Sequence, residues 1–238
     1  MKYFIAALIG ISLGVATVGL AIYHNPWTAQ NSKVGIDPAP DRTFELYYGS
    51  MIGDSIAYTN GGSAYLPRRP SDIGELWQRT LKQAHAAVHE LTNKDDVFAG
   101  IGVKFGAWSR ATRPLTGKVM MNSVWYIYLP GSGGFFVEQQ ENYWPFIRSV
   151  AIPALMDGDK KWEGEFDSDL TAGPGPAFEG LVIGGSGVLR GHRGEAREAI
   201  SVAGFSMGAQ HTSDEIRIRH SLTVAINAPE SEVTARIE

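Results

Sequence analysis

Apolar and polar residues alternate in short runs from about residue 42 onward, which is the period of strands with one buried face. Glycine and proline separate the runs, for example at Pro130-Gly131 and Asp157-Gly158, and these residues are typical of turns. The predicted strands are residues 44–48, 101–108, 118–129, 134–141, 161–167, 178–183, 189–206 and 215–227.

The last predicted strand has the clearest pattern. Its apolar face carries Ile216, Ile218, Leu222, Val224 and Ile226. The opposite face is polar, with Glu215, Arg217, Arg219, Ser221 and Thr223. His220 falls on the apolar face, so we expect its imidazole to point into the protein.

One segment, residues 72–92, has the apolar period of a helix. Asp72 and Glu75 form a capping box at its start, and Asn93 ends it. Its predicted apolar face carries Ile73, Trp77, Leu81, Ala84, Val88 and Leu91. Because helices do not alternate with strands, the pattern argues against a doubly wound α/β fold. A sandwich and a closed barrel both fit the strand count, and we predict a mainly β fold: an antiparallel eight-stranded (calycin-like) barrel with one flanking helix.

The N-terminal segment is uncharged and apolar over residues 4–23, long enough for a helix that crosses a bilayer. A cleaved signal peptide is the alternative, with Gly19-Leu20-Ala21 as its cleavage site. We therefore expect a signal anchor or signal peptide at 1–24, a proline-containing linker at 25–41, the barrel domain at 42–228 and a tail at 229–238. The domain would then lie in the cell envelope, in the periplasm on an inner-membrane anchor, or be exported.

The composition of the chain excludes thiol-based sites and argues against one class of partner. The chain has no cysteine, so it forms no disulfide and has no thiol nucleophile or thiolate metal ligand. Its net charge is −4, and its 21 basic residues are interspersed with acidic ones rather than clustered. This distribution argues against a nucleic-acid partner.

A glycine-rich motif lies between two predicted strands at residues 183–196. It contains Gly184, Gly185, Ser186, Gly187, Arg193, Gly194 and Ala196. The motif resembles the signature of the allene oxide cyclase and dirigent barrels, in which Gly-Gly-(Thr/Ser)-Gly is followed by an aromatic residue and an Ala-Arg-Gly-like triplet. Leu189 stands at the usual aromatic position and His192 at the usual alanine.

The resemblance implies an eight-stranded antiparallel barrel whose lumen holds a hydrophobic small molecule, and subunits that associate into dimers or trimers. Enzymes of this family cyclise or steer reactive intermediates with few catalytic groups. Dirigent proteins also carry a functional acid before a Pro-Leu-Thr sequence. Here Thr112 and Arg113 precede Pro114-Leu115-Thr116, so no catalytic residue carries over.

Candidate site residues therefore come from the strand pattern. His220 is the predicted catalytic residue, because a buried imidazole can act as acid or base on a bound molecule. Trp125, Tyr126 and Tyr128 are predicted to line a ligand pocket, with core packing as the alternative. His85 and His89 have metal-pair spacing on the predicted helix, but no third ligand is evident, and we expect a solvated helix flank, no metal and no cofactor.

Two functions fit these features. The first is an isomerase, cyclase or stereo-directing protein that acts on a hydrophobic molecule in the barrel. The second is a non-catalytic envelope protein, either a ligand-binding protein or an accessory subunit of a membrane complex.

We predict that the N-terminal segment stays in the protein, because its apolar run exceeds the roughly 7–15 residues of a signal peptide. Intact-mass measurement of the protein extracted from membranes should give the uncleaved chain. A mature start near Ile22 would show that the segment is a signal peptide instead.

Overall fold

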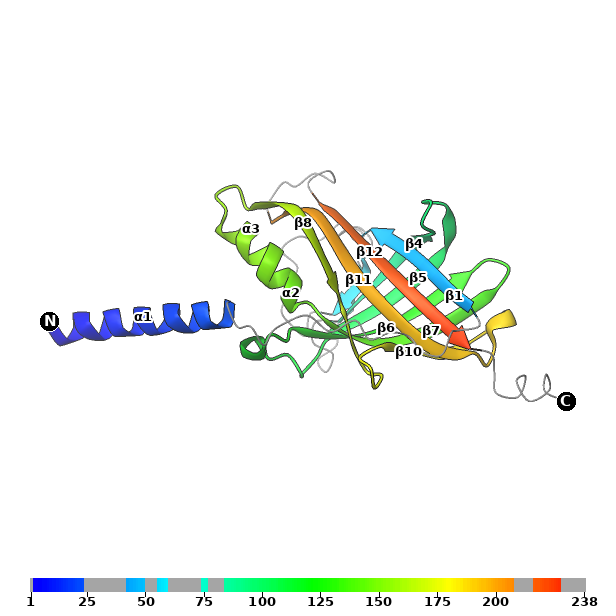
Figure 1. Cartoon of the computed structure of the whole chain (residues 1–238), viewed down its shortest axis with the longest axis horizontal. Coiled ribbons are helices and arrows are strands. Elements are labelled where there is room, and N and C mark those ends of the chain that lie inside the picture. The colour runs from blue at the N-terminus through cyan, green and yellow to red at the C-terminus, as the bar shows by residue number, and fades with distance from the viewer. Residues whose placement is uncertain are drawn as a thin grey trace.

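Eight antiparallel strands close into a barrel in the computed structural model (Figure 1). The structure describes residues 2–23, 42–49, 55–59, 74–76, 84–207 and 216–227. In spatial order the barrel strands are β1 (Arg42–Gly49), β12 (Arg217–Asn227), β11 (Arg193–Ser206), β10 (Gly180–Gly185), β7 (Gly133–Asn142), β6 (Met120–Leu129), β5 (Phe98–Trp108) and β4 (Ala84–Thr92). Pairing of Tyr47 on β1 with Thr92 on β4 closes the ring. The predicted eight-stranded antiparallel barrel is confirmed.

Two further strands complete the wall between β7 and β11. The short β10 pairs with β11 only at Gly194–Ala196, and β8 (Lys161–Asp169) pairs with the rest of β11 from Ala199 to Ser206. The three-residue β9 (Thr171–Gly173) pairs with the end of β7. The strand position between β7 and β11 is thus shared by β10 at one end and by β8 and β9 at the other. Outside the ring, β2 (Ser55–Thr59) pairs with β4 and β3 (Gly74–Leu76) pairs with β2.

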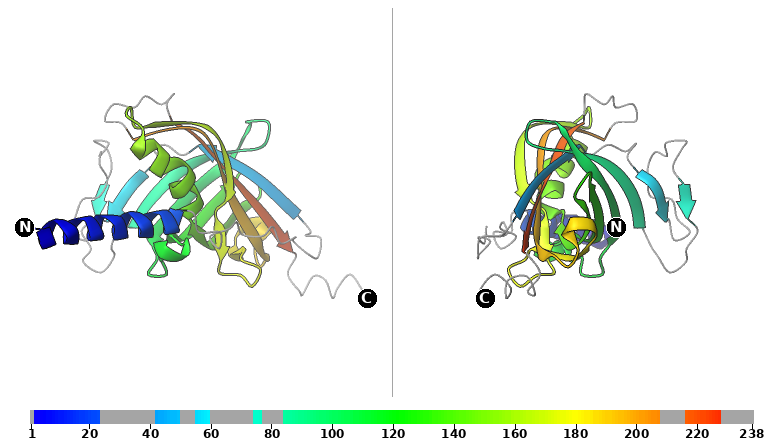
Figure 2. Two further views of the ribbon diagram at one scale, coloured as in Figure 1. Left: turned by 60° about the vertical axis from the view of Figure 1, so that its left-hand side comes forward. Right: turned by 90° about the vertical axis from the view of Figure 1, so that its right-hand side faces the viewer.

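The flanking helical segment lies between β7 and β8, not where the sequence pattern placed it. It consists of α2 (Trp144–Phe146), one π-helical turn (Ile147–Ala151) and α3 (Ile152–Met156). Val150 of this segment packs with Leu170, Ile200 and Val202 in a second apolar cluster, so the segment covers the β8 and β11 end of the barrel (Figure 2).

The helix predicted at residues 72–92 is wrong. Residues 74–76 form β3 and residues 84–92 form β4, whereas Asp72, Trp77 and Leu81 lie outside the described residues. The segment 84–92 contains small and apolar residues at both helical and strand spacing, so its periodicity alone did not decide its structure. Its pairing with β5 from Ala84 to Thr92 selects the strand, because it satisfies the backbone of both segments.

The N-terminal residues form α1 (Lys2–Tyr23), as predicted for a helix. Within the described part of the chain, no helix combines the length and the apolar character needed to cross a membrane.

Alternation of side chains fills one half of the barrel with apolar residues. This apolar cluster includes four fully buried side chains from β6 and β12: Trp125, Ile127, Leu222 and Val224. Leu189, from the turn after β10, packs against them. Interdigitated aliphatic and aromatic side chains of this kind supply most of the free energy of folding.

The glycine motif joins adjacent antiparallel strands, as predicted. Gly184 and Gly185 end β10, Gly187 begins a three-residue 3-10 turn (Gly187–Leu189) with a φ of +64°, and β11 begins at Arg193. A Cβ atom on Gly185 would lie 2.3 Å from the Leu189 carbonyl oxygen, so the turn closes only because this residue has no side chain.

Replacing Gly185 with alanine should therefore lower the free energy of unfolding by about 1–3 kcal/mol, because the turn must open to admit the methyl group. Gly184→Ala is the matched control, since a Cβ there meets nothing within 4 Å. Urea unfolding of the two variants measures the difference. Equal stability of both would show that the close approach of Gly185 does not constrain the turn.

Candidate functional site

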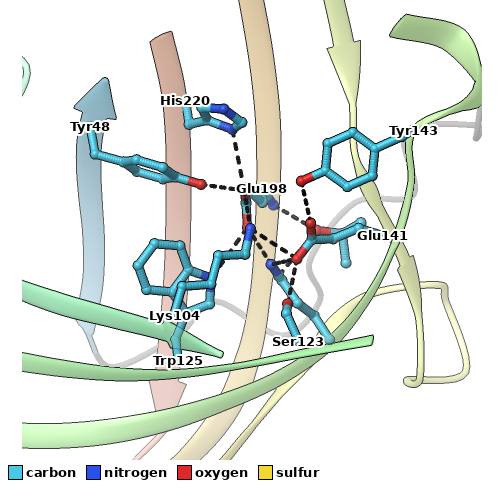
Figure 3. Close-up of polar contacts among 10 residues, drawn as sticks. Tyr48, Lys104, Ser123, Trp125, Glu141, Tyr143, Glu198 and His220 are labelled. Atoms are coloured by element: carbon cyan, nitrogen blue, oxygen red, sulfur yellow. Dashed lines mark hydrogen bonds and ion pairs between the residues drawn. The ribbon is translucent and has the colours of Figure 1, made fainter. Parts of the chain in front are cut away.

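Polar side chains meet at the centre of the barrel, where a simple alternating pattern would place only apolar ones. Tyr48, Lys104, Glu141, Glu198 and His220 each have at most 5% of their surface exposed. They project inward from β1, β5, β7, β11 and β12, so the cluster is assembled from strands around the whole ring (Figure 3). We call these five residues, with Ser123, Trp125, Gln139 and Tyr143, the polar cluster.

Glu198 is the hub of the polar cluster. Its Oε1 accepts hydrogen bonds from the Tyr48 hydroxyl at 2.5 Å and from Lys104 Nζ at 2.8 Å. Its Oε2 accepts from Trp125 Nε1 at 3.3 Å, from Lys104 Nζ at 3.1 Å and from Gln139 Nε2. A buried carboxylate is stable only when its oxygens are bonded in this way.

A second carboxylate, Glu141, shares the same ammonium. Lys104 Nζ lies 2.9 Å from Glu141 Oε1, which also accepts hydrogen bonds from Ser123 Oγ and, at 2.9 Å, from Gln139 Nε2. Glu141 Oε2 accepts from the Tyr143 hydroxyl at 2.6 Å, which ties the start of the helical segment to the cluster. Lys104 therefore bridges two carboxylates with no exposed surface.

His220 lies inside the barrel, as predicted. Its Nδ1 is 3.3 Å from Glu198 Oε1 but outside hydrogen-bond geometry, so the contact becomes an ion pair only when the imidazole is protonated. The ring stacks on Tyr48, its partner across the β1–β12 ladder, with centroids 4.6 Å apart and an interplanar angle of 11°. The ring centroids of His89 and Tyr48 are also 4.6 Å apart, with an angle of 50° between the ring planes.

Charges in the polar cluster stabilise one another. Burial raises the pKa of the Glu198 carboxyl, but Lys104 and His220 more than offset it and hold this pKa well below its usual range. Burial also favours neutral Lys104, yet Glu141 and Glu198 outweigh that effect and raise the pKa of its ammonium. Burial, and after it the two carboxylates, raises the pKa of Tyr48 and of Tyr143 well above 10.0. At neutral pH Glu198 is thus charged, Lys104 is charged, and both tyrosines are hydrogen-bond donors.

The histidine pair predicted on a helix lies on β4 instead. Both side chains are on the inward face of this strand. Burial lowers the pKa of His85 to about 4, and the nearby charges of Lys104 and His89 act in the same direction. The His85 ring lies against Gly106 and close to Met121. Among the residues that the structure describes, no group of three or more histidine, cysteine or acidic side chains could hold a metal ion.

The predicted aromatic pocket residues are divided between the two faces of β6. Trp125 is fully buried in the polar cluster, whereas Tyr126 is partly exposed and Tyr128 is 45% exposed on the outer surface. Consecutive strand residues point to opposite faces, so Trp125 and Tyr126 cannot both line the lumen. Only Trp125 stays a candidate for contact with a luminal molecule.

Sequence reasoning missed Lys104, Glu198 and Tyr48 as site residues. Alternation predicts the outer face for Lys104, because Ile101 and Phe105 form the apolar face of its strand. Glu198 carried a readable signal, since it lies between Ala196 and Ile200 on the buried face of its strand. A charged residue on the apolar face of a strand implies a buried partner.

Comparison with known proteins gives no family assignment. No model of a protein family matches the chain, and no curated protein matches it. One similar solved structure is described as a nonspecific heme-binding cyclase that catalyzes [4 + 2] cycloaddition during neoabyssomicin biosynthesis. The two sequences are 10% identical, and the match covers 82% of this chain and 71% of the cyclase chain, with a TM-score of 0.34. A likeness this distant carries no conclusion about function, and the resemblance to the allene oxide cyclase and dirigent barrels stays a prediction.

Replacing Glu198 with glutamine should leave Lys104 with one carboxylate and lower the free energy of unfolding at pH 7 by about 3–5 kcal/mol. The pH dependence should change as well. Because folding depresses the pKa of Glu198, its stabilisation is present above the ordinary pKa of 4.5 and is lost as the pH falls below it. Urea unfolding measured between pH 7 and pH 3 should therefore show that Glu198→Gln loses less free energy of unfolding on acidification than the native protein does.

Glu45→Gln, an exposed change on β1, serves as the control and should keep the native pH dependence. If Glu198→Gln loses stability on acidification as steeply as the native protein does, the Glu198 pKa is not depressed.

Proposed function

We propose that the barrel binds a small, largely hydrophobic molecule and acts on it by proton transfer, as an isomerase or cyclase. One observation carries this proposal: His220, Tyr48, Lys104 and two carboxylates converge in a water-excluded barrel interior. Ionisable groups gathered in a desolvated interior are typical of catalytic sites.

The polar cluster divides the barrel interior and suggests where the molecule binds. On the side of β10 and its turn, Trp125, Phe135, Leu189 and Leu222 pack closely, with 0–1% of their surfaces exposed. On the other side, Tyr143 of the cluster adjoins the start of the helical segment, and His85 lies on the inward face of β4. We place the bound molecule on this second side, where the helical segment lies over the barrel end and would limit access of water.

Each group of the cluster has a distinct proposed role. His220 accepts or donates the proton, because an imidazole ring carries both a nitrogen that can donate and one that can accept. Ionised Glu198 would stabilise the imidazolium at 3.3 Å, and Tyr48 holds the imidazole by ring stacking. Lys104 balances the carboxylate charge so that Glu198 stays ionised.

A specific observation favours the alternative, a non-catalytic binding protein. Both oxygens of Glu198, and both oxygens of Glu141, already accept hydrogen bonds from the protein. A cluster saturated in this way can act as a rigid partition that shapes a ligand site without reacting. The protein would then bind a hydrophobic molecule in the cell envelope, or serve as an accessory subunit of a membrane complex.

Both functions are proposed for the cell envelope, with the membrane as a partner through the N-terminal segment. The support is in the sequence, where residues 4–23 carry no charge. The intact-mass measurement described above tests this location.

Deuterium exchange separates the two functions. Small molecules that copurify with the protein can be identified by native mass spectrometry and then incubated with it in D₂O. A proton-transfer enzyme should exchange ligand hydrogens for deuterium, and His220→Gln should abolish the exchange with the circular dichroism spectrum unchanged. Under the binding function, His220→Gln should weaken affinity only about 2- to 10-fold, the worth of one hydrogen bond.

His192→Gln, in the turn before β11, is the matched histidine control and should behave like the native protein. Absence of deuterium from the ligand with native protein would reject the enzyme function, and failure to copurify or bind any hydrophobic molecule would reject both.

A further inference from the structure

One end of the barrel carries a turn that is basic and contains no acidic residue. This turn (residues 109–118) joins β5 to β6, and we call it the basic turn. Its three charged side chains, Arg110, Arg113 and Lys118, are exposed, and Leu115 between them is 63% exposed. No acidic side chain in the described part of the chain forms an ion pair with any of the three cations. The basic turn therefore presents positive charge and an apolar side chain together.

Hydrogen bonds brace the basic turn against the barrel. The backbone N–H of Arg113 donates to the Lys118 carbonyl oxygen at 2.7 Å. Asn142 Nδ2, at the end of β7, donates to the Gly117 carbonyl oxygen at 3.1 Å. Leu115 is thus held at the surface by the fold, so little conformational entropy would be lost when the turn meets a partner.

Further exposed apolar side chains lie at the same end of the barrel. Leu155 and Met156 end α3 and are 58% and 82% exposed. Trp108 ends β5, is also exposed, and has its ring edge-on to Tyr143 of the polar cluster, with centroids 6.3 Å apart. Figure 1 shows α3 and the basic turn at the end of the barrel from which α1 extends. Tryptophan and aliphatic side chains beside cationic ones are typical of surfaces that meet lipid headgroups.

The N-terminal helix α1 adjoins the basic turn. It contacts the turn at Pro114–Thr116. Its apolar side chains are uncovered, and Ile11, Leu13 and Val15 are between 63% and 69% exposed. An uncovered apolar helix next to a basic turn calls for a partner with apolar and anionic parts side by side, and a lipid bilayer has both.

We propose that this end of the barrel docks onto an anionic lipid bilayer. Leu115, Leu155 and Met156 enter the headgroup layer, while the cations of the basic turn lie against lipid phosphates. An acidic protein would complement the cations but would leave the apolar helix beside them uncovered. Docking turns the barrel end that the helical segment covers toward the membrane, so a hydrophobic molecule would pass between lipid and lumen without crossing water. The docking itself does not rest on the proposed function.

Because the chain has no cysteine, a fluorophore attached to one introduced cysteine reports the surroundings of a single position. The full chain carrying Leu115→Cys, labelled with nitrobenzoxadiazole, is reconstituted into vesicles of phosphatidylcholine and phosphatidylglycerol. Its emission should shift to the blue and should be quenched by lipids that carry a nitroxide near the headgroup. Val188→Cys is the matched control, since Val188 is 59% exposed in the turn after β10, at the other end of the barrel, and its label should stay unquenched.

The contribution of charge is tested in the same labelled protein. Arg110→Gln/Arg113→Gln should lower the ratio of docked to undocked protein about 30-fold, because each cation near an anionic surface contributes to binding. Vesicles of phosphatidylcholine alone should reduce the quenching in the same way. Arg190→Gln/Arg193→Gln, two exposed arginines at the other end of the barrel, is the charge-matched control and should keep the native quenching.

Three results would overturn the proposal. The first is a label at position 115 that stays unquenched while the protein floats with the vesicles, which would leave the N-terminal segment as a membrane contact and remove the docking of the barrel. The second is equal quenching at positions 115 and 188, which would show adhesion without orientation. The third is quenching that is unchanged in Arg110→Gln/Arg113→Gln.

Discussion

The ion pair between Lys104 and Glu198 is the interaction on which the interior of this barrel depends. In the ring of eight strands, β5 and β11 are four positions apart in either direction, so the pair joins opposite walls across the lumen. Glu141 on β7 holds the same ammonium from a third direction. A single buried charge would be prohibitively costly, and its desolvation is offset only because both partners are fully bonded.

This cross-lumen pair organises the side chains around it. Tyr48, Trp125 and Gln139 all donate to Glu198, and each comes from a different strand. The register of the barrel is therefore tied to a polar cluster as well as to an apolar core. A one-residue slip of any contributing strand would turn its polar side chain outward and leave a buried charge without a partner.

The same cluster separates the two halves of the interior. Apolar packing fills the half near the glycine motif, whereas the half near the helical segment contains His85, whose pKa is lowered, and Tyr143, whose pKa is raised. His220 lies at the boundary, stacked on Tyr48 and near Glu198. Under the proposed function His220 transfers the proton, and under the alternative the saturated carboxylates only shape a binding site.

By itself the sequence determined the local and periodic features of this protein. Alternation located eight of the strand regions and placed His220 inside, because a strand exposes successive residues to opposite faces whatever its partners. The glycine motif was correctly assigned to a connection between adjacent strands, since a positive φ and a close backbone approach demand glycine locally.

Only the tertiary structure decided what depends on partners far away in the chain. Residues 84–92 fit two periods, and pairing with β5 made them a strand. Lys104 and Glu198 are 94 residues apart, so no local pattern shows that they meet. The alternation of Ile101 and Phe105 with glycine even favours the outer face for Lys104.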